Sequence, residues 1–410
     1  MTVLYSIGAA LAAVAIVLGV LPILLTLRFR RYVDVRLRRP LTGYAPKVSI
    51  ILPCKGVDPG FEANLQAIFD QDYPDFEVIF ATAAAEDEAC PSIRRVIAEN
   101  PEVPARLVHA GLPVTCSQKL NNQLHAIAEI RPDTAVIVFL DSDGRLDRSF
   151  LRRLVDPLGS DDVGVTTGYR WYSPVRGGAG SWVRTTWNGG AYPFLVMSGT
   201  AFAWSGAMAI RRELFDNAGV ARRWQRAITD EFTLTAAVKE AGKTICFVPS
   251  CIAVSHEDST LRETIEWTNR QTLLMRVYQP RSWWSIFIGY ALGNLLALVG
   301  VAVVVVSLRG PASVDNVYLA MGVAMLLPVL LGPVNVALML PAICRMTPPD
   351  VARGIVRSWT RFCAACPAAS LLILANSVHS SLTNCMTWRG VRYQLRSPTN
   401  IAILSPRAGG

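Results

Sequence analysis

Residues 135–143, AVIVFLDSD, join an apolar run to two carboxylates that are one residue apart. The five residues 136–140 are all apolar, which is typical of a strand buried on both faces of a parallel sheet. Asp141 and Asp143 follow at once, and Gly144 ends the run. Because two like charges at this spacing repel each other and gain little from packing, their position predicts a cation between them.

The residues before this stretch alternate between strand and helix patterns. We expect strands at 47–56, 76–82 and 105–111, and helices at 60–72, 90–100 and 116–130. Strands that alternate with helices predict an α/β domain whose mostly parallel sheet is covered on both faces. Ligands of such sheets bind beyond the carboxyl ends of the strands, where Asp141 and Asp143 lie.

The composition indicates a membrane protein, because 51% of the 410 residues are apolar and only 17% are charged. Residues 1–27 carry no charge, and a strongly basic segment, 28–40, follows them. This order predicts an N-terminal membrane anchor with the next residues in the cytoplasm, whereas a cleaved signal peptide would need basic residues first. The net charge is +9, and the basic residues cluster beside the apolar runs. Their position favours anionic lipid over nucleic acid as a partner.

Apolar runs return near the C-terminus. Those at 286–308 and 317–344 are long enough to span a bilayer, although Pro328 and Pro333 would kink the second. The run at 363–385 contains polar residues and has basic residues on both sides, so we expect it to lie along the interface or to re-enter. These boundaries predict a cytoplasmic domain at 46–280, a membrane region at 286–385 and a cytoplasmic tail at 386–410.

Asp141 and Asp143 are candidate metal ligands. Carboxylate oxygens suit Mg²⁺ or Mn²⁺, which keep coordination positions open for phosphate oxygens and would neutralise a departing diphosphate. His256 follows the strand-like segment 251–255 and is a candidate third ligand, although a lone histidine is more often structural.

Two residues near the predicted strand ends are candidates for binding a nucleotide. Lys119 lies near the start of the helix expected at 116–130, a position from which it could contact a phosphate or simply be solvated. Asp87, in AAAEDEACP (83–91), could accept a proton from a nucleobase N–H or cap the next helix.

Asp230 and Glu231 start an amphipathic helix within 227–249. A carboxylate at this position is stabilised by the helix dipole, so capping explains one of the two. The second is a candidate general base, which would take the proton from an attacking hydroxyl.

Residues of two further segments are candidates for contact with a substrate, and the resemblance described below implies that they lie on the acceptor side. Ser205 and Gly206 belong to a segment where glycine would let the backbone approach a substrate closely, the alternative being an ordinary turn. Trp267, Arg270 and Gln271 lie in EWTNRQ (266–271), just before the membrane region, where they could face the diphosphate or the lipid headgroups.

Taken in order, these residues resemble membrane-bound glycosyltransferases of families 2 and 21, and most closely the ceramide glucosyltransferases. The resemblance extends over nearly the whole chain. It is carried by KGVDP (55–59), DYPDFEV (72–78), QKLNNQ (118–123), LDSDGRL (140–146), SGAMAIRRELFDNAG (205–219), ITDEFTL (228–234) and TWRGVRYQLR (387–396).

The resemblance implies a GT-A type domain that inverts the anomeric centre while moving a hexose, glucose from UDP-glucose, to the hydroxyl of a lipid such as ceramide. Glu231 falls on the position of the catalytic base, where aspartate is usual, and Asp230 is its rival. The donor-binding positions implied by the resemblance are Lys55, Asp58, Asp87, Lys119 and Asp141.

The chain departs from the family before the membrane region, where Gln or Arg, two residues and Arg-Trp are usual. Of this pattern Glu263–Trp267 retains only the tryptophan, and Arg270 would take the role of the missing arginine. Other acceptors remain open, namely a sterol, a hopanoid, diacylglycerol or a growing polysaccharide. Two other classes of protein also remain open, a metal-dependent hydrolase and an inactive membrane scaffold. Measuring the release of UDP from a UDP-sugar in the presence of lipids would distinguish both from a transferase.

Overall fold

The computed structural model of the chain describes residues 2–309 and 316–404. A seven-stranded sheet has the strand order β3-β2-β1-β4-β6-β5-β7. Within it β6 runs antiparallel to both of its neighbours, and every other pairing is parallel. The strands are β1 (Val48–Pro53), β2 (Phe76–Thr82), β3 (Ala105–His109), β4 (Val136–Leu140), β5 (Val163–Tyr172), β6 (Ala207–Arg211) and β7 (Thr244–Ser255).

Strand β4 lies in the middle of this sheet and is buried on both faces. Val138 belongs to an apolar cluster with side chains of α2, α3 and α5, whereas Ile137 and Phe139 belong to a second cluster with α4, α8 and α9. The α/β domain predicted from the alternating patterns is therefore confirmed. Its helical elements are α2 (Phe61–Phe69), α3 (Ala89–Glu99), α4 (Gln118–Ala128), α5 (Phe150–Val155), η1 (Asp156–Gly159), α6 (Ala179–Gly189), η2 (Tyr192–Val196), α7 (Arg212–Asn217), α8 (Val220–Trp224), α9 (Asp230–Glu240) and α10 (Leu261–Tyr278).

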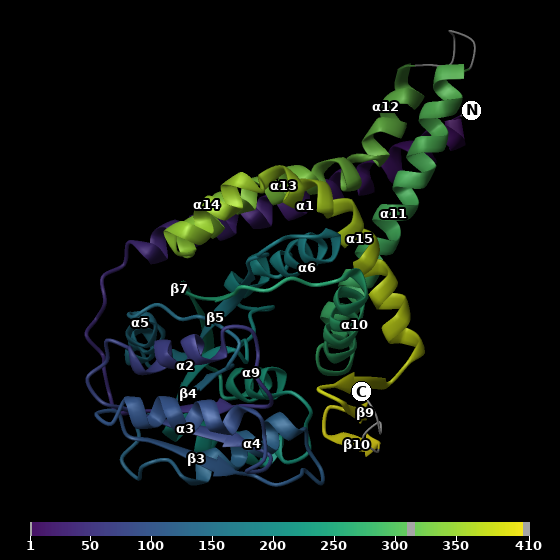
Figure 1. The fold of residues 1–410 in the computed structure, drawn as a ribbon. Coiled ribbons are helices and arrows are strands. Elements are labelled where there is room, and N and C mark those ends of the chain that lie inside the picture. Colours follow the sequence, from purple (N-terminus) through teal and green to yellow (C-terminus); the bar gives the residue numbers. More distant parts are fainter. Residues whose placement is uncertain (1, 310–315, 405–410) are drawn as a thin grey trace.

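Long apolar helices flank the sheet domain at both ends of the chain. Among the described residues, four helices are long and apolar enough to span a membrane: α1 (Thr2–Leu37), α11 (Pro280–Arg309), α13 (Leu327–Met346) and α15 (Trp359–Leu382). Helix α1 packs along both α12 (Asn316–Met325) and α13, and the short helix α14 (Pro349–Arg357) follows α13. In Figure 1, α1, α13 and α14 form a band above the sheet domain.

Two of the predicted apolar runs take a different form. The run at 317–344 is split between α12 and α13, and Pro328 lies in the first turn of α13, where its missing N–H costs nothing. The run at 363–385 lies almost entirely within α15, an uninterrupted helix of 24 residues rather than a re-entrant turn.

The C-terminal segment, expected as a tail, folds into a three-stranded antiparallel sheet of β8 (Cys385–Trp388), β9 (Val391–Ser397) and β10 (Asn400–Leu404). Met386 and Tyr393 pack against Leu273 and Leu274 of α10, beside which the sheet lies in Figure 1. The amide N–H of Gln118 donates to the Tyr393 hydroxyl over 3.3 Å. Residues 385–404 are therefore part of the folded domain, and residues 405–410 lie outside the described residues.

Candidate active site

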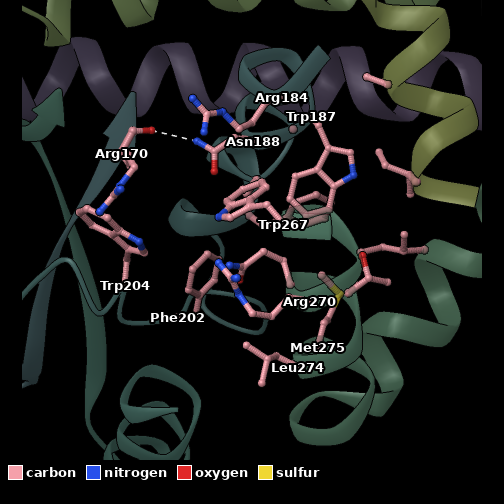
Figure 2. A pocket seen from close by; sticks show the side chains of 18 of the residues that line it. Arg170, Arg184, Trp187, Asn188, Phe202, Trp204, Trp267, Arg270, Leu274 and Met275 are labelled. Carbon is pink, nitrogen blue, oxygen red and sulfur yellow. Dashed lines mark hydrogen bonds between the residues drawn. The ribbon is translucent and has the colours of Figure 1, made fainter. Parts of the chain in front are cut away.

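A cavity of about 1340 Å³ opens at the carboxyl edge of the sheet and extends between the apolar helices. Charged side chains line one end of it, and residues of α1, α11, α13 and α15 line the other. Aromatic side chains also line the cavity, and Figure 2 shows Trp187, Phe202, Trp204 and Trp267 among them. The charged lining residues are Lys55, Asp58, Lys119, Asp141, Asp143, Arg170, Arg184, Asp230, Glu231, Glu257, Arg270, Arg281 and Arg389.

The strand directions explain why these charges meet. Asp141 follows the last residue of β4, and Lys55 lies just after β1, which runs parallel to it. Because β6 is antiparallel, Ser205, two residues before the start of β6, reaches the same edge. Arg170 lies near the end of β5. Residues far apart in the sequence are therefore collected where open α/β sheets bind their ligands.

Asp141 and Asp143 are both paired with cationic side chains. Lys119 Nζ lies 2.7 Å from Asp141 Oδ1. The Arg170 guanidinium bridges the pair, with Nη2 at 3.1 Å from Asp141 Oδ2 and Nη1 at 2.6 Å from Asp143 Oδ2. Burial alone would raise the pKa of Asp143, but the charge of Arg170 holds that pKa below its usual range. Burial opposes the charge of Lys119, yet the carboxylates of Asp141 and Asp230 raise its pKa.

The ligand atoms that Asp141 and Asp143 offer fit a divalent cation. Asp141 and Asp143 offer only carboxylate oxygens, the ligands that Mg²⁺ and Mn²⁺ prefer, and both face the cavity. His256 does not join them: its side chain is exposed and does not line the cavity, because it follows β7 on the side of Arg145 and Asp350. Among the described residues no three His, Cys, Asp or Glu side chains group as a metal site. The structure thus gives no support to His256 as a third ligand.

Asp230 and Glu231 occupy the first turn of α9 but have different surroundings. Asp230 is 2% exposed, accepts a hydrogen bond from Gln123 Nε2 (2.8 Å) and lies 3.4 Å from Lys119 Nζ. Glu231 accepts a single long hydrogen bond, from the Ser205 amide at 3.4 Å. Burial, with the neighbouring charge of Asp230, raises the pKa of Glu231 to about 7, although Lys119 acts in the opposite direction. The raised pKa of Glu231 suits a base near neutral pH.

Two donor-side candidates meet the C-terminal sheet. Lys55 Nζ donates to the carbonyl oxygen of Arg389 over 2.5 Å, and the Arg389 guanidinium contacts both Asp58 oxygens at 2.9 and 3.0 Å. Burial raises the pKa of Asp58, and the charge of Arg389 opposes this rise. Arg389 itself has a φ of 48°, a left-handed conformation that is uncommon for a residue other than glycine. The turn between β8 and β9 is therefore held firmly against the donor-side loop.

Asp87 lies beside this region without lining the cavity. Its Oδ1 accepts hydrogen bonds from the backbone amides of Gly56 (2.9 Å) and Ala89 (3.0 Å). The carboxylate therefore ties the loop after β2 to the loop after β1, and it also orients the start of α3.

Some of the acceptor-side candidates line the cavity and others do not. Trp267, Arg270 and Gln271 of α10 line the cavity with Ser205, whereas Gly206 does not. A side chain at Gly206 would meet the Trp204 ring at 2.1 Å, so packing accounts for this glycine. Figure 2 shows Arg270 among the aromatic side chains of the cavity, and burial lowers its pKa to about 10.

Sequence reasoning missed Arg170 and Arg389. Arg170 lies in VGVTTGYRWY (163–172), where an arginine in a strand that is otherwise uncharged was a signal that could have identified it. Arg389 lies in the quoted motif TWRGVRYQLR, but its contact with Asp58 joins residues 331 positions apart, which no local pattern reveals.

Comparison with known proteins identifies the family. The family model described as glycosyl transferase family 21 matches residues 9–401. Ceramide glucosyltransferase 1 of Caenorhabditis elegans is 34% identical over 106 residues, which are 25% of this chain and 23% of the relative. Ceramide glucosyltransferase of Komagataella phaffii is 32% identical over 133 residues, 31% of this chain and 26% of the relative. The matched segments thus span about a quarter of each curated relative.

The comparison with solved structures matches a mannosyltransferase. The mannosyltransferase PcManGT from Pyrobaculum calidifontis, in complex with GDP-Man and Mn²⁺, is 18% identical, with a TM-score of 0.49 over 91% of this chain and 98% of that chain. The match of the family model over residues 9–401 decides the assignment. The chain belongs to glycosyl transferase family 21.

Proposed function

We propose that this protein is an inverting glycosyltransferase of the cytoplasmic membrane face, which moves a hexose, glucose from UDP-glucose, to the hydroxyl of a lipid such as ceramide. Membership in family 21 supports transfer as the reaction. Matched relatives that are ceramide glucosyltransferases support a sphingolipid as the acceptor.

The observation that carries this proposal is the continuity of the cavity. One volume of about 1340 Å³ is lined by Asp141 and Glu231 at one end and by Leu21, Leu331 and Leu371 of the apolar helices at the other. This exceeds the roughly 300–1,000 Å³ of ordinary ligand pockets, so it has room for a polar donor and part of a lipid together. A lipid chain can remain among apolar helices while its hydroxyl reaches the charged end.

The charged end has the groups that a nucleoside diphosphate sugar requires. Lys119, Arg170 and Arg270 bring positive charge to the cavity, where a diphosphate would be attracted. Asp141 and Asp143 would hold a divalent cation, Mg²⁺ or Mn²⁺. When bound, that ion would neutralise charge on the departing diphosphate.

Glu231 is the proposed general base. Its carboxylate would accept the proton of the acceptor hydroxyl while the hydroxyl oxygen attacks the anomeric carbon and the bond to the diphosphate breaks on the opposite face. A pKa of about 7 leaves the carboxylate ionised in a large fraction of molecules at neutral pH and still basic enough to take the proton. Asp230, held by Lys119 and Gln123, would position this turn of α9 rather than react.

Incubation of the purified full-length protein in lipid nanodiscs with radiolabelled UDP-glucose tests the proposal. Separate nanodiscs would contain ceramide, diacylglycerol, a sterol or a hopanoid, each with Mn²⁺, and UDP release and labelled lipid would both be measured. We expect label in ceramide and UDP release that depends on it. Release of UDP without labelled lipid in any nanodisc would indicate a hydrolase, and label in another lipid alone would replace ceramide as the acceptor.

A further inference from the structure

Arg170 occupies the position between the two carboxylates where a metal ion is expected. Its guanidinium contacts Asp141 through Nη2 and Asp143 through both terminal nitrogens. The guanidinium also lies 5.1 Å from the centre of the Trp204 ring and 5.5 Å from that of Tyr172. The side chain of Arg170 is 9% exposed, so these contacts form in a site largely removed from water.

The backbone of Arg170 is fixed, but its side chain reaches the carboxylates along a flexible stem. Asn188 Nδ2 and the Tyr192 hydroxyl both donate to the Arg170 carbonyl oxygen, at 3.0 and 3.1 Å, and Figure 2 shows the first of these bonds. The guanidinium can therefore move within the cavity while β5 stays in place. Its fork of N–H donors matches a phosphate as well as it matches a carboxylate.

With Lys119 on Asp141 and Arg170 on both carboxylates, the charge of the pair is already balanced. A divalent cation placed there would be repelled by a guanidinium a few ångströms away, in surroundings of low dielectric. A diphosphate changes this balance, because it offers Arg170 anionic oxygens of its own.

We propose that Arg170 is an internal counter-cation of Asp141 and Asp143, which the donor diphosphate draws away so that the divalent cation can bind. This proposal depends on the nucleotide-sugar site proposed above. It makes Arg170 a positioning residue that couples the two ligands, so that the nucleotide increases the affinity for metal and, by thermodynamic reciprocity, metal increases the affinity for nucleotide by the same factor.

The test is the binding of Mn²⁺ to the full-length protein in nanodiscs, measured from the electron paramagnetic resonance signal of free Mn²⁺ with and without UDP. Without nucleotide, we expect Arg170→Gln to bind Mn²⁺ about tenfold more tightly than the wild type, within the usual range of coupling between sites. The further gain in Mn²⁺ affinity that UDP produces should be smaller in Arg170→Gln than in the wild type. Arg170→Lys, which keeps one positive charge but not the fork, should fall between the two.

Arg184→Gln is the matched control, because Arg184 lines the same cavity but pairs with Glu257, 3.2 Å away, rather than with Asp141 or Asp143. Its Mn²⁺ affinity without nucleotide should equal that of the wild type. Equal or weaker Mn²⁺ binding by Arg170→Gln, with the variant still folded by its thermal melting curve, would overturn the inference. Because this readout needs neither sugar nor acceptor, its failure is distinguishable from failure of the lipid transfer assay.

Discussion

Lys119 forms an ion pair with Asp141, with 2.7 Å between Nζ and Oδ1, although 22 residues separate them in the sequence. The same ammonium lies 3.4 Å from Asp230. One cation thus joins the carboxylate proposed for the metal to the carboxylate beside the proposed base. Because Asp230 is engaged in this way, Glu231 is left as the carboxylate whose raised pKa suits proton transfer.

Replacement of Glu231 by Gln should reduce lipid glycosylation by roughly 10²–10⁴-fold, because the amide cannot take the proton of the hydroxyl. UDP should bind as it does to the wild type, since the base acts on the acceptor. The measurements are initial rates of transfer and calorimetric binding of UDP. Asp230→Asn is the matched variant, and if it were inactive while Glu231→Gln kept its rate, the base would be Asp230.

The same variant should alter stability in a way that depends on pH. The folded protein raises the pKa of Glu231 from 4.5 to about 7, so the folded state holds this proton more tightly than the unfolded state does. The protonated group favours folding at pH below about 4.5, and this contribution is lost as pH rises through about 7. Glu231→Gln should therefore melt at a higher temperature than the wild type at pH 8, with the difference vanishing near pH 4.5. The rise in pKa from 4.5 to about 7 corresponds to about 3 kcal/mol in the free energy of unfolding. A lower melting temperature for Glu231→Gln than for the wild type at pH 8 would contradict this prediction.

The rate of transfer should depend on pH for the same reason. The basic form of Glu231 is depleted below its raised pKa, so kcat should fall about tenfold per pH unit well below pH 7. The measurement is the rate at saturating donor and acceptor between pH 5 and 8. A rate that is flat down to pH 5 would contradict a base with a raised pKa, because a carboxylate of ordinary pKa would still be ionised there.

Asp141→Ala should lower transfer by at least about 100-fold, because it removes one of the two carboxylates proposed to hold the metal at the diphosphate. Insertion into the membrane should be unchanged, since the apolar helices are untouched. Glu266→Gln is a control at an exposed carboxylate next to the cavity residue Trp267. Full activity of Asp141→Ala in the presence of a chelator would eliminate the metal role.

The sequence predicted the strands of the sheet that have regular patterns and missed β5. Strands β1 to β4 are uninterrupted apolar or alternating runs, and each was predicted near its observed bounds. Strand β5 contains Thr166, Thr167 and Arg170, all buried, so its pattern does not indicate a buried strand. Those polar residues are satisfied by contacts with distant segments, which a local pattern does not encode.

The residues of the candidate site also divide into those that a local sequence pattern indicates and those that it does not. The position of Asp141, Asp143 and Glu231 at the cavity could be predicted, because each follows a strand end or starts a helix. Arg389 could not, because it reaches the cavity only after the chain has passed through the apolar helices and returned as the β8–β9 turn. His256 does not line the cavity, whereas the next residue, Glu257, does.

Arg389→Ala should raise the KM for the donor sugar several-fold and change kcat less, because it removes the guanidinium that ties Asp58 to the turn between β8 and β9. Arg392→Ala, at an exposed position on β9, is the matched control and should leave the KM unchanged. Donor saturation curves for the two variants give the measurement. Equal KM values for Arg389→Ala and the wild type would mean that this turn does not shape the donor site.

The last prediction concerns the side of the membrane on which β8–β10 lies. Near its start α15 is bonded to the sheet domain, where Thr186 Oγ1 donates to the Phe362 carbonyl oxygen over 3.3 Å. Near its end Asn376 Nδ2 donates to Asn269 Oδ1 of α10 over 2.7 Å. Both ends of α15 thus contact the same domain, and a helix that crossed the bilayer would carry one end away from it.

The sheet that follows α15 gives a second reason to expect that α15 does not cross the membrane. Arg389 contacts Asp58, and Tyr393 contacts Gln118, both beside the proposed donor site. These contacts require that β8–β10 share a compartment with the sheet domain. We therefore expect α15 to lie along the membrane surface against α6 and α10, although its 24 residues are long enough to span.

Labelling of single engineered cysteines with an impermeant thiol reagent tests this topology. Thr399→Cys, in the exposed turn between β9 and β10, should react only after the cells are permeabilised, as should Glu102→Cys in an exposed loop of the sheet domain. Val3→Cys, at the N-terminal end of α1, should react in intact cells, because the basic residues near the C-terminal end of α1 retain that C-terminal end in the cytoplasm. If Thr399→Cys reacted in intact cells while Glu102→Cys did not, α15 would cross the membrane, and the contacts of Arg389 and Tyr393 with the donor site would have no place in the native protein.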